Sequence, residues 1–200
     1  MTMLSWKTIS TIFLQIVVAV GVLQPAPAIV VRVETALGNI DIDVDTVHAP
    51  LTAANFLRYV DDKLYDGGQF HRATRPDNYV PQLPDRPPMQ IIQAGINSAK
   101  RPFAPIPLER TTTTGLKHVS GTVSMARGEA ADSATSDFFI CVDDEPSLDF
   151  GSKRYADGQG FAAFGRVVKG MDVVKKIQAA PAEGQTLAPP VKIIKVVRKP

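Results

Sequence analysis

Short runs in which apolar and polar residues alternate recur along this chain, as in β-strands with one buried face. The first two runs occupy residues 30–35 and 39–44, and the tripeptide Ala36-Leu37-Gly38 between them predicts a hairpin turn. Similar runs occupy residues 69–73, 89–95, 121–126, 138–142, 160–168 and 191–198. The pattern therefore predicts about eight strands.

Two segments show helical spacing instead. From residue 50 to about residue 64, apolar side chains recur every three or four positions, and Pro50 stands where the first turn of a helix tolerates proline. Residues 171–179 repeat this spacing, with Lys175 and Lys176 near the C-terminal end, where basic side chains stabilise a helix. Eight strands with mostly antiparallel connections and two helices predict a mainly β fold, either a barrel or a sandwich.

The strand predicted for residues 138–142 is apolar on both faces. Strand alternation places Phe138 and Ile140 on one side, and Phe139 and Cys141 on the other. An apolar second face lies under another layer or forms a contact site. The strand thus indicates either a second packed layer or an apolar binding surface beside the core.

Residues 74–88 contain five prolines and cannot form a central strand. We expect a proline-stiffened surface loop there. Its two ends adjoin the strands of residues 69–73 and 89–95, so it is either a rim of a binding site or a tolerated insertion.

The first 28 residues have the composition of a secretory signal peptide. Lys7 gives a basic start, residues 9–23 are mostly apolar, and Ala26-Pro27-Ala28 is a small-residue cleavage motif. A membrane anchor is the alternative, but a spanning helix needs about 20 apolar residues, and this run is shorter. We therefore predict a signal peptide over residues 1–28, a single domain over residues 29–200, and no stable membrane insertion after processing.

Charge and residue usage exclude several functions. The chain has 22 basic and 20 acidic residues that are scattered along the sequence, so nucleic acid is not an expected partner. Cys141 is the only cysteine and cannot form an intramolecular disulfide.

The three histidines have no metal-ligand spacing, so neither a metal nor another cofactor is expected. Ser136, His118 and Asp137 could form a hydrolytic triad, but no nucleophile elbow surrounds the serine.

Several ordered blocks resemble the cyclophilin-type peptidyl-prolyl cis/trans isomerases, in particular their bacterial secreted branch. The two strongest are GTVSMAR, residues 121–127, and DSATSDFFI, residues 132–140. The others, in the family's order, are Gly38-Asn39-Ile40, Ala54-Asn55-Phe56, Phe70-His71-Arg72, Ile92-Gln93-Ala94-Gly95, Ser147-Leu148-Asp149, Phe164-Gly165-Arg166-Val167 and Gly170-Met171-Asp172-Val173-Val174. The resemblance covers roughly residues 31–198. It implies a closed eight-stranded antiparallel barrel capped by two α-helices, with the active site on an outer face.

The resemblance also implies roles for individual residues. Arg72 stands at the position of the family's catalytic arginine, and Gln93 at that of the glutamine that orients the peptide carbonyl. The implied proline-binding residues are Ile91, Met125, Ala126, Phe139, Leu148 and Phe161. Four departures from the family concern the site. Gln90 falls where the family often has a pocket phenylalanine, although Met89 could substitute, and Asp137 replaces a frequent glutamine beside the peptide groove. Ser147 stands where some members have a tryptophan, and Phe161 where many have a histidine.

The function implied is acceleration of rotation about Xaa-Pro peptide bonds during protein folding. The alternative is a weakly active peptide-binding chaperone or scaffold that uses the same groove, and the presence of Arg72 favours the enzyme. The expected partners are unfolded or extended proline-containing polypeptides. We expect a monomer in the periplasm.

Overall fold

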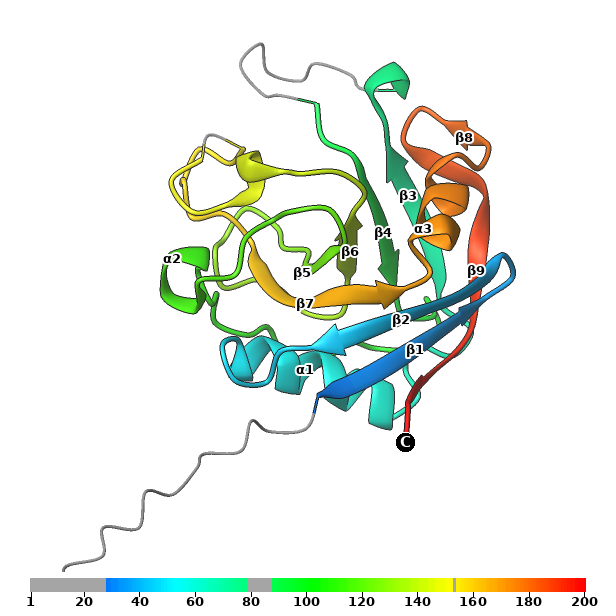
Figure 1. Ribbon diagram of the computed structural model, residues 1–200, viewed down its shortest axis with the longest axis horizontal. Coiled ribbons are helices and arrows are strands. Elements are labelled where there is room, and N and C mark those ends of the chain that lie inside the picture. Colours follow the sequence, from blue (N-terminus) through cyan, green and yellow to red (C-terminus); the bar gives the residue numbers. More distant parts are fainter. Residues whose placement is uncertain (1–27, 79–87, 153) are drawn as a thin grey trace, which may run out of the picture.

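Eight antiparallel strands close into a barrel in the computed structural model, which describes residues 28–78, 88–152 and 154–200 (Figure 1). Their order is β1-β2-β7-β5-β6-β4-β3-β9, and pairing of β1 with β9 closes the sheet. The strands are β1 (Ile29–Thr35), β2 (Gly38–Val44), β3 (Gln69–Thr74), β4 (Ile91–Gly95), β5 (Thr122–Met125), β6 (Phe138–Cys141), β7 (Ala162–Lys169) and β9 (Thr186–Arg198). The predicted closed eight-stranded barrel is thus confirmed, and the two-residue β8 (Ala182–Glu183) pairs with β9 as an addition.

Two helices pack their apolar sides onto the barrel core. Helix α1 (Pro50–Asp61) contributes Phe56 and Tyr59, and α3 (Met171–Gln178) contributes Val174 and Ile177, all fully buried. Both were predicted from their spacing. A third helix, the single turn α2 (Thr111–Thr114), was not predicted, since four threonines show no helical periodicity.

The last strand begins five residues earlier than the sequence predicted. The alternating run predicted a strand start at Val191, directly after Pro189 and Pro190, which cannot donate to a sheet ladder. In the structure the pairing of β9 with β3 is irregular between Phe70 and Arg72, and the prolines fall at this irregularity. The extra length matters because it brings the hairpin between β8 and β9 beside Arg72.

A second apolar cluster lies outside the barrel core. Strand β6 contributes side chains to the barrel core and to this second cluster, because Phe138 packs in the core while Phe139 packs in the second cluster. The buried members of this outer cluster are Met89, Ile91, Phe139, Cys141, Leu148 and Phe161. The two-sided strand is therefore explained by two separate apolar clusters.

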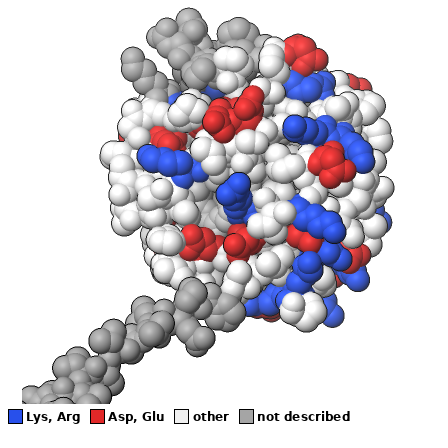
Figure 2. All heavy atoms as spheres, in the orientation of Figure 1, with Lys and Arg blue, Asp and Glu red and all other residues white. Residues whose placement is uncertain are grey.

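Two sequence predictions fall largely outside the described residues: the signal peptide, apart from Ala28, and the central part of the loop over residues 74–88. Within the described ranges, no helix is both long and apolar enough to cross a membrane. Basic and acidic side chains intermingle on the face shown in Figure 2. This face therefore has no continuous basic surface of the kind that binds nucleic acid.

Candidate active site

A pocket of about 260 Å³ opens over the outer apolar cluster. Its walls come from β3, β4, β6, the short 3-10 turn Pro146–Leu148 and the segment before β7. The lining residues are Arg72, Met89, Ile91, Gln93, Ala126, Arg127, Phe139, Leu148, Arg154, Tyr155 and Phe161. The pocket thus combines an apolar floor with arginines at its edges.

Arg72 and Gln93 lie side by side on neighbouring strands. They are register partners in the β3–β4 pairing, and the Arg72 Nη1–H donates to Gln93 Oε1 over 3.1 Å. Gln185 holds the guanidinium from another direction, because its Oε1 accepts from Arg72 Nε at 3.1 Å and from Nη2 at 2.7 Å. Burial, together with the nearby positive charge of Arg154, lowers the pKa of Arg72 from its usual value, but such a guanidinium stays protonated.

Gln93 also reaches toward a carboxylate at the edge of the site. Its Nε2 donates to Asp137 Oδ2 over 3.4 Å, and His71 Nε2 lies 3.7 Å from the same oxygen. The Asp137 side chain is 40% exposed. The residue that replaces the family's frequent glutamine thus places negative charge beside Gln93.

The floor of the pocket is aromatic and aliphatic. The Phe139 and Phe161 rings meet edge to face at 5.4 Å, and Ile91 and Leu148 are almost completely buried beside them. Met89 lines the pocket, while the Gln90 side chain donates to Asp143, which does not line it. Of the two residues that could stand at the position of the family's pocket phenylalanine, it is therefore Met89 and not Gln90 that lines the pocket.

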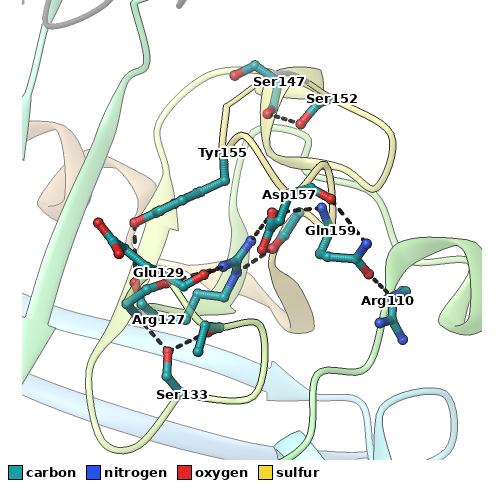
Figure 3. A network of polar contacts seen from close by, with 12 residues as sticks. Arg110, Arg127, Glu129, Ser133, Ser147, Ser152, Tyr155, Asp157 and Gln159 are labelled. Atoms are coloured by element: carbon teal, nitrogen blue, oxygen red, sulfur yellow. Dashed lines mark hydrogen bonds and ion pairs between the residues drawn. The ribbon is translucent and has the colours of Figure 1, made fainter.

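Arg127 ties together the loops that form the far wall (Figure 3). Its Nη2 donates to Asp157 Oδ1 at 2.9 Å and its Nε to the Gly160 carbonyl at 2.8 Å. The guanidinium carbon lies 4.4 Å from the Tyr155 ring centroid and 5.3 Å from that of Phe161, within the range of cation–π contacts. Since its side chain is fully buried, Arg127 acts as a structural link between the segment after β5 and the segment before β7.

Three hydrogen-bonded polar residues, Asp149, His118 and Ser124, are buried next to Phe139. His118 Nδ1 lies 2.8 Å from Asp149 Oδ1, and Nε2 lies 3.0 Å from Ser124 Oγ. Burial alone would raise the pKa of Asp149, but hydrogen bonds from His118 outweigh it and leave that pKa lowered. The His118 ring stacks at 6.0 Å on Phe139. Because His118 is 1% exposed and Ser124 fully buried, this Ser-His-Asp arrangement is closed to substrate.

The hydrolytic triad considered from the sequence does not form. The Ser136 hydroxyl donates to Asp137 Oδ1 at 3.3 Å, while both ring nitrogens of His118 are directed to Asp149 and Ser124. Burial raises the pKa of Cys141 well above its usual value, so its thiol is not a thiolate nucleophile. Among the described residues, no group of three or more His, Cys, Asp or Glu side chains could hold a metal ion.

Seven of the eight predicted site residues line this pocket, and Met125 does not. Met125 is 1% exposed and packs in the main barrel core, because it alternates with Ser124 on β5. Contrary to the prediction, Met125 therefore does not lie at the pocket. The lining residues that the sequence reasoning missed were Arg127, Arg154 and Tyr155. Arg127 directly follows the Met125-Ala126 pair and could have been noticed, whereas Arg154 and Tyr155 lie in a segment without periodicity.

The site is thus a pocket on the outer face of a closed barrel, with an apolar floor beside the guanidinium of Arg72. The family model described as cyclophilin type peptidyl-prolyl cis-trans isomerase/CLD matches residues 30–198. Peptidyl-prolyl cis-trans isomerase A of Dickeya dadantii is 37% identical over 155 residues, which cover 76% of this chain and 73% of that protein. A peptidyl-prolyl cis-trans isomerase of Acinetobacter baylyi is 38% identical over 173 residues, covering 83% of each.

The fold is shared with a cyclophilin type peptidyl-prolyl cis-trans isomerase of Cryptosporidium parvum, whose crystal structure was determined in the presence of the dipeptide Ala-Pro. That structure matches with a TM-score of 0.64 at 20% identity, covering 86% of this chain and 99% of the other. The chain belongs to the cyclophilin-type peptidyl-prolyl cis-trans isomerase family. The resemblance noted in the sequence is confirmed.

Proposed function

We propose that the pocket accelerates cis/trans rotation about Xaa-Pro bonds, with Phe139, Leu148 and Phe161 holding the proline ring and Arg72 acting on its nitrogen. Rotation is slow because the amide nitrogen shares its lone pair with the carbonyl, which creates a barrier of about 18–20 kcal/mol. Uncatalysed exchange takes roughly 10–100 s. A site that binds the twisted amide better than the planar one lowers this barrier by differential binding.

The observation that carries the proposal is the placement of Arg72. Its guanidinium lies at the edge of the apolar floor, with hydrogen bonds to Gln93 and Gln185. In the twisted amide the nitrogen becomes pyramidal and its lone pair can accept a hydrogen bond. A hydrogen bond from a charged donor contributes about 1.5–3 kcal/mol, and that bond is weaker in the planar ground state, where the lone pair is delocalised. Gln93 lies close enough to Arg72 to orient the carbonyl of the same peptide.

The substrates follow from the same geometry. An apolar pocket of this size takes a proline ring, and the side chains of Gln93 and the partly exposed Asp137 beside it can contact the chain next to the proline. Unfolded or extended proline-containing polypeptides are therefore the proposed partners. The Cryptosporidium structure, determined in the presence of Ala-Pro, is consistent with this choice.

Isomerisation of a proline tetrapeptide by the purified protein tests the proposal. We expect Arg72→Ala to lower kcat/KM at least about tenfold, because a lost hydrogen bond of about 1.4 kcal/mol corresponds to that factor. Arg166→Ala, which removes an exposed arginine of β7, is the matched control. A folded Arg72→Ala variant with normal turnover would refute the mechanism. If the wild-type protein suppressed aggregation without isomerase activity, the chaperone alternative would replace it.

We also propose that residues 1–28 are a signal peptide and that the mature protein acts in the periplasm. The support is the sequence of this segment, with Lys7, the apolar run and Ala26-Pro27-Ala28. The first strand begins directly after it, at Ile29. Mass spectrometry of exported protein is expected to give Ile29 as the N-terminal residue. Recovery of residues 1–28 in membrane-bound protein would favour the anchor instead.

A further inference from the structure

Gln185 is fixed in the fold next to Thr186, the register partner of Arg72. It lies between β8 and β9, after Gly184, whose φ of 59° makes the tight turn. The Gln185 carbonyl accepts from the Ala73 amide over 3.0 Å. Asn78 Nδ2 donates to both the Gly184 and the Ala73 carbonyls at 3.0 Å, which ties the hairpin to the end of β3. The Gln185 backbone is therefore anchored without any help from its side chain.

The Gln185 side chain contacts Arg72 in a fork. Its single Oε1 accepts from Nε at 3.1 Å and from Nη2 at 2.7 Å, while Gln93 accepts from Nη1 at 3.1 Å. A guanidinium has five N–H groups in one plane, so these two amides engage three of them. The two acceptors lie at different edges of the planar group, Gln185 at the Nε–Nη2 edge and Gln93 at Nη1. Together they fix the orientation of the guanidinium, which a single partner would leave free to turn.

The chemical nature of the two acceptors matters as much as their position. Both are neutral amide oxygens rather than carboxylates. A carboxylate at either place would orient the guanidinium equally well, but its negative charge would offset the positive charge that the twisted amide needs. Neutral acceptors hold the cation and leave its charge available to the substrate.

We propose that Gln185 is a positioning residue for isomerisation, holding Arg72 in its working orientation through a neutral side-chain oxygen. The inference rests on the proposed role of Arg72. It assigns to the hairpin between β8 and β9 a part in catalysis, although Gln185 does not line the pocket. Because a preorganised donor is worth more than a mobile one in the transition state, the effect falls on turnover rather than on proline binding.

Two substitutions of Gln185 distinguish its effect on the orientation of the Arg72 guanidinium from the effect of the charge on its side chain. Gln185→Ala removes the acceptor but keeps the backbone bond to Ala73, and we expect kcat to fall about tenfold while KM stays within about twofold. Gln185→Glu keeps an acceptor and adds a negative charge, and we expect a similar loss of kcat. Glu183→Ala, on the exposed part of the same hairpin, is the control and should retain wild-type kinetics. Wild-type kcat in Gln185→Ala would overturn the positioning role, and wild-type kcat in Gln185→Glu would overturn the requirement for neutrality.

A double-mutant cycle tests whether Gln185 acts through Arg72. In an Arg72→Ala background, Gln185→Ala is expected to cause no further loss, because the group it positions is gone. An additional tenfold loss there would overturn the proposal. If Arg72→Ala alone had normal activity, the proposed function itself would fail, which is a different result from a silent Gln185→Ala in an Arg72-dependent enzyme.

The Arg72 Nε–H resonance gives a readout that does not depend on activity. In ¹⁵N-resolved NMR spectra it is assigned by its absence in Arg72→Ala. We expect it to shift and to exchange faster with solvent in Gln185→Ala, while Glu183→Ala leaves it unchanged. An unshifted, equally protected resonance in Gln185→Ala would show that the fork does not hold the guanidinium in solution.

Discussion

The buried carboxylate of Glu145 makes the stability of this protein depend on pH in an unusual direction. Glu145 is 4% exposed and accepts a hydrogen bond from the Gln90 amide at 2.6 Å. Burial, the dominant cause, and the neighbouring negative charges of Asp143 and Asp144 raise its pKa from the ordinary 4.5 to about 6, although the Gln90 amide and Arg154 oppose this. The folded protein therefore binds this proton more tightly than the unfolded chain.

The size of the effect follows from the shift. One pKa unit corresponds to about 1.4 kcal/mol, so the difference between 4.5 and about 6 amounts to about 2 kcal/mol. The folded state binds more protons in this window, so the free energy of unfolding decreases as pH rises. The contribution of Glu145 is fully present below pH 4.5 and is lost as pH rises through 6.

Glu145→Gln isolates this contribution, because it keeps the shape and the acceptor for Gln90 but cannot titrate. Urea unfolding followed by circular dichroism is the suitable assay, since the only tryptophan, Trp6, lies outside the barrel domain. We expect the unfolding free energy of the wild type, minus that of the variant, to fall by about 2 kcal/mol between pH 4.5 and 7.5. The exposed Glu183→Gln serves as the control, with a constant difference. Parallel curves for wild type and Glu145→Gln would refute the reasoning.

Two further predictions concern other parts of the barrel. Hydrogen bonds from Arg32 and Lys199, chiefly from Arg32, lower the pKa of Asp41 to about 2. The ionised Asp41 therefore stabilises the folded protein by about 2 kcal/mol above pH 4, and this contribution is lost as pH falls toward 2. In urea titrations the unfolding free energy of Asp41→Asn should fall much less between pH 4 and pH 2 than that of the wild type. Met125→Ala should lower the unfolding free energy by roughly 2–5 kcal/mol with kcat/KM of the folded protein unchanged, whereas Phe161→Ala should raise KM several-fold; a matching rise in KM for Met125→Ala would return Met125 to the site.

The barrel could be predicted from the sequence because most of its strands carry a local signal. The hairpin of β1 and β2 and the helices α1 and α3 were found from periodicity, which burial of one face imposes. Closure of the sheet could not be read in this way. The pairing of β1 with β9 joins residues more than 150 positions apart, and only the family resemblance implied it.

The residues of the site likewise fall into those that a local sequence signal predicts and those that only long-range pairing brings there. Phe139 lies at the pocket, as expected, because alternation separates it from Phe138. Met125 was placed at the pocket edge with Ala126 from the family block, although alternation sets it on the same side as Val123, which faces the barrel core. Gln185 was not found, since the alternating run placed the start of the strand at Val191, six residues after it. Residues brought to the site by sheet pairing, rather than by a local motif, leave no trace in a single sequence.

The separation of Phe138 from Phe139 also explains how one barrel keeps stability and catalysis apart. Strand β6 is hydrogen-bonded to β4 and β5 along its length, so its backbone position is set by the sheet and by the inner core that contains Phe138. The outer cluster adds its own contacts to a strand that is already fixed. Changes around Phe139 and Phe161 can therefore alter the substrate that the pocket accepts while the barrel stays intact, whereas changes at Phe138 would disturb the barrel and the pocket together. Specificity is expected to vary among related barrels through the outer face of β6 and the loops above it, because these positions can change without repacking the core.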